Sequence, residues 1–297
     1  MNTFIVTLKY FLFIMGELTL LFIAISTLIA LVFTYISQDK LKTWMSGKGV
    51  WGNIMAVLFG AVTPFCACST VPMTLGLIQA GVPFGTVMSF VIASPLMDPL
   101  VFILLVAFMG WKVAIGFFLL TSVFSVFFGI LLEKMGWADQ IKNVRIKGER
   151  HEASIEQLKG FKNRLKASFI QAWRDFKAVL NYMVLGVAIG AVIYGYMPID
   201  LLSKVGGPDN PLAVLVVALI GMPLYIRVEA AIPIGLALMQ KGVSIGAVIA
   251  FIISGAGIAI PELSMLSSIF KKKIIIAFIV IVFAMAVISG LIFNMII

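Results

Sequence analysis

The sequence has little charge: of its 297 residues only 12% are Asp, Glu, Lys or Arg, whereas 62% are hydrophobic. A soluble domain carries about 25% charged residues to cover its surface. Several apolar stretches here approach or exceed the roughly 20 residues that a helix needs to cross a bilayer. The composition therefore excludes an ordinary soluble domain and predicts an all-α polytopic membrane protein.

Cysteine is scarce too, with only Cys66 and Cys68 in the chain. Two cysteines one residue apart cannot link distant parts of a large fold, and a disulfide between them would be strained. Two thiols are also too few for a structural zinc site, which needs four ligands. No GxxxxGK[ST] motif occurs, which excludes an ATPase motor of that kind. We therefore expect no cofactor, no resident metal and no enzymatic activity.

The positive charge is concentrated in one place. The net charge is +9, and the segment from Lys134 to Lys177 holds 11 of the 22 basic residues. A basic loop between membrane segments is typical of the cytoplasmic side. The interpretation is a multi-pass protein of the cell (inner) membrane with a cytoplasmic central loop, and no nucleic-acid partner. Spacing within this loop, from Leu158 to Trp173, predicts an amphipathic helix on the inner leaflet, with a solvated linker as the alternative.

The order of apolar segments repeats. Long apolar segments cover 10–36, 113–132, 176–197 and 274–297, and interrupted pieces lie between the members of each pair. We interpret 1–133 as a first transmembrane repeat, 134–175 as the basic linker and 176–297 as a second repeat. The first long segment exceeds a signal-peptide core and is expected to be retained.

Two stretches support a repeat at the residue level. Residues 73–94 align without gaps with 234–255, and the alignment pairs Gln79 with Gln240 and Gly81 with Gly242. Lysines after the first long segment and before the last one give the halves opposite orientations under the positive-inside rule. The prediction is therefore two inverted-topology repeats, with either three or five crossings in each.

Prolines interrupt the middle of both halves. They are Pro64, Pro72, Pro83, Pro95 and Pro99 in the first half, and Pro223, Pro233 and Pro261 in the second. Proline removes a backbone donor, and in lipid the freed groups must find partners or line a cavity. Paired, broken segments in two halves predict half-helices that meet near the membrane midplane around a substrate site.

The polar residues of these segments are the candidates for that site. The predicted substrate-binding residues are Cys66, Cys68, Ser69, Thr70, Gln79, Ser94, Tyr225, Arg227 and Gln240. Ionisable groups at membrane depth are rare and usually functional, so Asp98, Glu229 and Glu262 are candidates to carry a coupling proton. The alternatives are a structural ion pair between Arg227 and Glu229, and capping of broken helix ends by Asp98 and Glu262.

The two thiols have a specific chemistry. At positions i and i+2 of an irregular backbone, Cys66 and Cys68 project to one side, and such a pair suits a soft centre such as As(III), Cu(I) or Hg(II). A site with only two protein ligands suits a transported cargo, which must be bound and then released. The alternative is that each cysteine is a small hydrophobe in a core.

Residues 64–99, PFCACSTVPMTLGLIQAGVPFGTVMSFVIASPLMDP, resemble the predicted-permease family that includes the ArsP-type organoarsenical efflux permeases. The Pro-Glu pair at 261–262 and the basic central segment fit the same layout, so the resemblance covers essentially the whole chain. It implies a permease, and ArsP-type members export trivalent organoarsenicals with cysteine thiols. Cys66 and Cys68 are the residues it assigns to cargo, although many relatives have no assigned cargo.

The sequence thus favours a secondary transporter that exports a small solute, such as a trivalent organoarsenical, with proton coupling. Its expected partners are that solute and the lipid bilayer, and no oligomeric state is predicted. Two alternatives stay open: a membrane thiol oxidoreductase that uses Cys66 and Cys68, and a channel.

Overall fold

The structure, a computed structural model, describes residues 3–33, 45, 50–62, 67–142, 161–196, 212–223 and 228–296. These residues form helices and connecting turns, with one isolated antiparallel bridge between Ile141 and Phe270. Among them, three helices are long and apolar enough to cross a membrane, or four if the bent pair 245–257 and 260–266 is one span. The prediction of an all-α polytopic membrane protein is confirmed.

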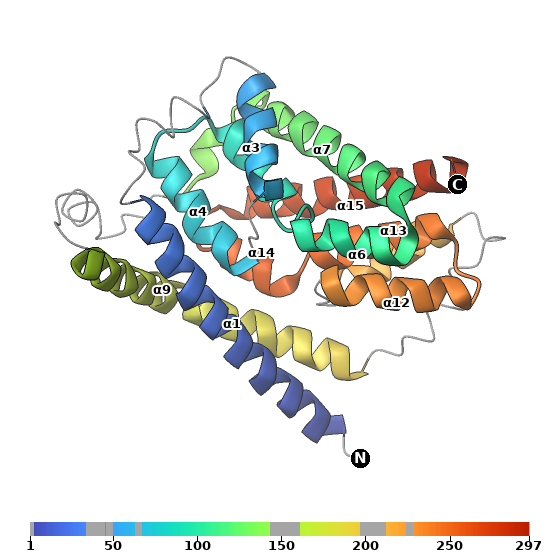
Figure 1. Ribbon diagram of the computed structural model, residues 1–297, viewed down its shortest axis with the longest axis horizontal. Coiled ribbons are helices and arrows are strands. Elements are labelled where there is room, and N and C mark those ends of the chain that lie inside the picture. The colour runs from blue at the N-terminus through green and yellow to red at the C-terminus, as the bar shows by residue number, and fades with distance from the viewer. Residues whose placement is uncertain are drawn as a thin grey trace.

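Four long helices correspond to the four long apolar segments (Figure 1). They are α1 (Thr3–Phe33), α7 (Trp111–Lys134), α9 (Phe161–Tyr196) and α15 (Lys272–Ile296). At 1.5 Å per residue, α7 and α15 are about 36 Å long, enough to cross the roughly 30 Å hydrocarbon core. Helix α9 is continuous through residues 175 and 176, where the sequence placed the boundary between linker and second repeat.

Short helices fill the middle of each half. In the first half they are α3 (Val50–Val62), α4 (Ala67–Gln79), α5 (Phe84–Ala93) and α6 (Pro99–Met109). In the second half they are α11 (Ala213–Gly221), α12 (Val228–Gln240), α13 (Ile245–Gly257) and α14 (Ile260–Leu266). The 10 residues of α5 extend only about 15 Å. Such a helix reaches about half-way through the hydrocarbon core.

Two helical hairpins, α4–α5 and α12–α13, turn in the same way. Each turn has a glycine with positive φ, 73° at Gly81 and 91° at Gly242. After each glycine, the N–H of a valine donates to a leucine carbonyl five residues earlier, Leu77 at 3.1 Å and Leu238 at 3.0 Å. A left-handed glycine with such a bond ends a helix and reverses the chain. The two turns occupy aligned positions of the stretches 73–94 and 234–255.

Each hairpin packs closely against the long helix that follows it. A Cβ added to Gly85 of α5 would lie 2.6 Å from the Gly129 carbonyl of α7, and one on Gly290 of α15 would lie 2.5 Å from the Gly246 carbonyl of α13. In the second half, Asn294 Oδ1 also accepts a hydrogen bond from the Gly246 N–H at 2.8 Å. Each hairpin turn therefore lies near the C-terminal end of its long helix.

The helices α7 and α15 run antiparallel. Residues 137–140 form a 3₁₀ helix, η1, after α7, and the chain then contacts the turn before α15. There Lys142 N donates to Ile269 O at 2.8 Å, and Lys271 N donates to Gln140 O at 2.9 Å. We call residues 139–142 with 267–271 the clamp, and the side of the molecule that holds it the clamp face. At the opposite end, a Cβ on Gly116 of α7 would lie 3.0 Å from the Phe293 ring of α15.

These contacts determine on which face of the molecule each hairpin turn lies. The α4–α5 turn lies with the C-terminal end of α7 on the clamp face, where the Phe84 and Phe270 rings also meet with centroids 6.5 Å apart. The α12–α13 turn lies with the C-terminal end of α15 on the opposite face. The hairpins therefore approach from opposite faces, and their open ends lie in the middle of the molecule.

The remaining long helices, α1 and α9, form one edge of the molecule. Figure 1 shows them crossing side by side and running in opposite directions. Their contact includes the rings of Phe22 and Phe176, whose centroids are 5.8 Å apart. Helix α9 also packs against α14, so this pair covers one side of the central helices.

Candidate substrate site at the centre of the helix bundle

The open ends of the two hairpins meet at buried polar residues. Thr70, in the first turn of α4, and Ser94, just after α5, are both fully buried, and their hydroxyl oxygens are 3.1 Å apart in a hydrogen bond. Two residues further on, Leu96 Cδ1 lies 3.6 Å from the position of a Cβ on Gly257, the last residue of α13. The start of α4, the end of α5 and the end of α13 therefore converge.

Glu262 brings a carboxyl group close to this point. It lies five residues after Gly257, in the first turn of α14, and its side chain is 0% exposed. Helix α14 contacts both α4 and α9, and Figure 1 shows it beside one end of α4. Of the two predicted proton-coupling candidates whose side chains are described, Asp98 and Glu262, only Glu262 is fully buried, where a charged carboxylate is costly.

Two prolines add backbone carbonyls to the centre. Pro72 and Pro233 are each the sixth residue of their helices, α4 and α12, and both helices continue through them. Neither proline has an N–H, so each leaves the carbonyl four residues earlier without its usual helical donor. Those carbonyls belong to Cys68 and Glu229. The sequence placed a break at Pro72, but the helix before it ends at Val62 and α4 runs from Ala67 to Gln79.

Several predicted site residues fall where little is described. Cys66, Tyr225 and Arg227 lie outside the described residues. The backbones of Cys68 and Ser69 lie in the first turn of α4, and that of Glu229 lies in the first turn of α12, but their side chains are not described. The role of these residues stays a prediction, although the three helical ones lie at the central ends of α4 and α12.

Other predicted residues lie away from the centre or have a local role. Gln79 and Gln240 are exposed at the far ends of α4 and α12. Gln79 lies nine positions after Thr70, which is about 14 Å along the helix. Asp98 is partly exposed, and its Oδ1 accepts a hydrogen bond from Leu100 N at 2.8 Å, which caps α6. Two roles were predicted for Asp98, capping a helix end and carrying a proton, and the structure shows the helix cap.

A second buried polar cluster lies where α3, α5 and α7 cross. The Ser89 hydroxyl lies 2.9 Å from Asn53 Oδ1 and 3.0 Å from the Ser125 carbonyl oxygen, and all three residues are buried. Sequence reasoning missed Asn53 and Ser125, which lie outside the proline-rich segment. A constant offset of 161 residues pairs this cluster with Val214, Ala250 and Ala286, so the first half alone carries it.

Long membrane-spanning helices around half-helices that meet at a buried polar centre define a polytopic membrane permease. The chain belongs to the ArsP-type family described as "Predicted permease", which matches residues 4–295. The resemblance seen in the sequence is confirmed.

The chain is similar to three curated proteins. It is 25% identical over 262 residues to the UPF0718 protein YcgR of Bacillus subtilis, covering 86% of this chain and 85% of that protein. It is 23% identical over 252 residues to a "putative two-component membrane permease complex subunit" of Streptococcus mutans, covering 82% and 80%. It is 27% identical over 135 residues to the UPF0718 protein MJ0584 of Methanocaldococcus jannaschii, covering 46% and 36%. No solved structure matches the chain.

Proposed function

We propose that this permease exports a small thiophilic solute, with a trivalent organoarsenical as the candidate cargo, and that it works by alternating access with proton coupling. The observation that carries the proposal is the hydrogen bond between Thr70 and Ser94 at 3.1 Å. It joins the start of α4, which contains Cys68, to the end of α5 in the middle of the bundle. The backbone of Cys68 belongs to that end of α4, and this supports a binding site for the solute between the two hairpins.

The orientation of the helices supports alternating access. Helices α7 and α15 follow equivalent hairpins, run antiparallel, and are joined at the clamp. Hairpins that enter from opposite faces and meet in the middle are the arrangement of transporters with inverted repeats, in which one repeat rocks against the other. In this proposal each half provides one hairpin, and the solute binds between their open ends.

The two halves then have different tasks. Cys66 and Cys68 occur in the first half, and thiols bind soft centres such as As(III). Glu262 in the second half would take up a proton in one orientation and release it in the other, because a neutral carboxyl is far less costly than a carboxylate at that depth. The clamp face carries Lys134, Lys142 and Lys271 to Lys273 and would be cytoplasmic by the positive-inside rule.

The test uses everted vesicles and a trivalent methylarsenical. Wild-type protein should accumulate the arsenical, and accumulation should increase when the vesicle lumen is acidified, because protons then leave the lumen in exchange for the cargo that enters. The variant Cys66→Ser/Cys68→Ser should lose uptake, since a hydroxyl is a poor ligand for As(III). Glu262→Gln should retain downhill flux and lose its dependence on the gradient. Glu133→Gln, which removes an exposed carboxyl from α7, is the matched control and should behave as wild type.

The outcomes separate the parts of the proposal. Well-folded wild-type protein that moves no arsenical would rule out this cargo. Cysteine variants with normal uptake would show that the thiols do not bind it. Flux that only follows the concentration gradient of the arsenical, and is unaffected by the proton gradient and by Glu262→Gln, would indicate a channel.

A further inference from the structure

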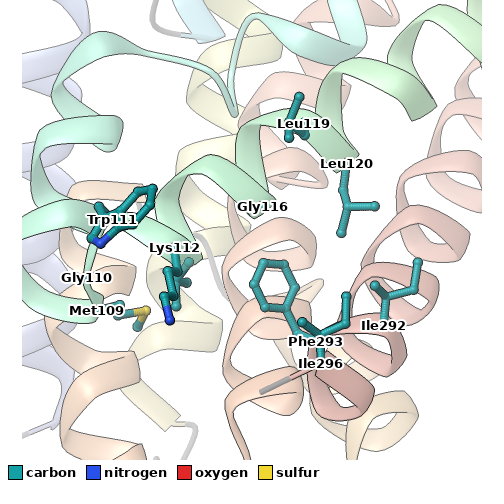
Figure 2. A pocket seen from close by; sticks show the side chains of 11 residues that line it. Met109, Gly110, Trp111, Lys112, Gly116, Leu119, Leu120, Ile292, Phe293 and Ile296 are labelled. Carbon is teal, nitrogen blue, oxygen red and sulfur yellow. The ribbon is translucent and has the colours of Figure 1, made fainter.

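A groove opens between the start of α7 and the end of α15, on the face opposite the clamp (Figure 2). Its volume is about 750 Å³, within the range of roughly 300–1,000 Å³ that is usual for sites of small organic ligands. The groove is remote from the Thr70–Ser94 centre, because Trp111 and Ile296 lie at the outer ends of the two long helices. The proposed transport site does not account for it.

The groove is apolar along its length and open to the side. Its inner wall is formed by Phe293, which is only 4% exposed, and by Gly116, whose lack of a side chain leaves room for the groove. Its outer edge includes Leu119, which is 61% exposed. Along α7, Val123 and Phe127 continue the same exposed apolar face. In a bilayer this face would contact acyl chains, so the groove is accessible from lipid.

One end of the groove carries a positive charge, unlike the apolar remainder. Trp111 and Lys112 form this end, and Figure 2 shows the Lys112 amine on the groove side, across from Phe293 and Ile296. Among the described residues that line the groove, Lys112 is the only charged one. Tryptophan is enriched where a membrane helix meets the headgroups, and a lysine there extends its amine toward the polar region.

We propose that this groove binds an anionic phospholipid, with one acyl chain along Phe293 and Leu119 and the phosphate at Lys112. A long apolar slot with a single cation at its membrane-surface end matches an amphiphile that has one negative headgroup. A lysine amine close to a phosphate is attracted by its negative charge, so it favours a headgroup with a net negative charge. A zwitterionic lipid fills the slot equally well, but its headgroup offers no net negative charge to the lysine.

The test compares two lipids with identical acyl chains by native mass spectrometry of the full chain in detergent. Offered equal amounts of phosphatidylglycerol and phosphatidylcholine, wild-type protein should retain about fivefold more of the anionic lipid, the preference expected for one lysine near the headgroup. Lys112→Gln should bring the ratio close to one, and Lys112→Arg should preserve it. Lys273→Gln, which removes a charge at the other end of α15, should leave the ratio unchanged.

Two further variants test the slot itself. Gly116→Leu places a side chain against Phe293 and should lower retention of both lipids. Leu119→Gln makes the same slot polar at an exposed position that does not support the fold. An unchanged ratio in Lys112→Gln, or unchanged retention of both lipids in Leu119→Gln, would refute the proposal. So would a protein dimer that Leu119→Gln separates, because the occupant of the groove would then be a second copy of the chain.

Discussion

Leu96 and Gly257 lie beside each other at the centre of the bundle, with Leu96 Cδ1 3.6 Å from the position that a Cβ on Gly257 would occupy. They also occupy matching positions in the predicted repeats, because the gap-free match of 73–94 with 234–255 reaches them when it is continued by two positions. A contact between equivalent residues is expected only at the axis that relates two repeats. In the proposed transporter this contact marks the point about which the halves exchange orientation.

The hydrogen bond between Thr70 and Ser94 should contribute measurably to stability. We expect Thr70→Val and Ser94→Ala each to lower the free energy of unfolding by about 1 kcal/mol, since each removes the buried hydrogen bond between the two hydroxyls. The double variant should lose less than the sum, by about 0.5–1.5 kcal/mol. Denaturant titration in detergent micelles gives these values. Thr27→Val, which removes a bond within α1 only, is the control, and strictly additive losses would contradict the prediction.

The glycines at the helix crossings should be intolerant of a methyl group. In Gly129→Ala the new Cβ would overlap Ser89 Oγ, and in Gly290→Ala it would overlap the Gly246 carbonyl. Overpacking of this kind costs about 1–3 kcal/mol. We expect lower thermal stability in detergent for both variants. The matched control is Gly16→Ala, where nothing lies within 4 Å of the added Cβ, and stability there should be unchanged or higher.

Asp98 should act as a helix cap and not as a proton carrier. Its Oδ1 accepts from Leu100 N, and an asparagine at the same position keeps that acceptor. Asp98→Asn should therefore retain both stability and gradient-driven transport, while Asp98→Ala should lose about 1 kcal/mol of stability. Vesicle uptake and thermal melts measure the two effects. Loss of the gradient dependence in Asp98→Asn would transfer the coupling role from Glu262 to Asp98.

The two faces of the molecule should be accessible from opposite sides of the membrane. In a background of Cys66→Ser and Cys68→Ser, we introduce Lys271→Cys on the clamp face and Lys112→Cys at the groove. An impermeant maleimide should label Lys271→Cys in everted vesicles and Lys112→Cys in right-side-out vesicles. Labelling of both from the same side would be incompatible with α7 and α15 crossing the membrane in opposite directions.

The sequence was a good guide wherever local chemistry decides the structure. The four long apolar segments predicted four long helices, and α1, α7, α9 and α15 lie there. The paired glycines Gly81 and Gly242 lie at the two hairpin turns, because a helix that reverses needs a residue with positive φ. Pro99 begins α6, as expected for a residue that fits the first helical turn.

Features set by long-range packing could not be predicted from the same patterns. The approach of α5 to α7 depends on Gly129, which is one small residue within a long apolar helix and gives no local signal. The offset of 161 residues that relates Gly85 to Gly246 also relates Gly129 to Gly290. Extending the comparison of the two halves through the long helices would have revealed this second pair. The difference between Asp98, which is a cap, and Glu262, which is buried, likewise depends on which helices cover each residue.

The half-length hairpins have a consequence for how the chain is synthesised. A helix such as α5, whose 10 residues are about half as long as a hydrocarbon core is thick, cannot remain alone in lipid with its terminal backbone groups unsatisfied. Leu96, just after α5, lies beside Gly257 at the end of α13, and ribosomes produce Gly257 only after most of the chain has emerged. The first hairpin must therefore reach its final depth late in biogenesis. A nascent chain that stops before Ala213 contains its first half in an incompletely inserted form, which makes it a substrate for membrane quality control.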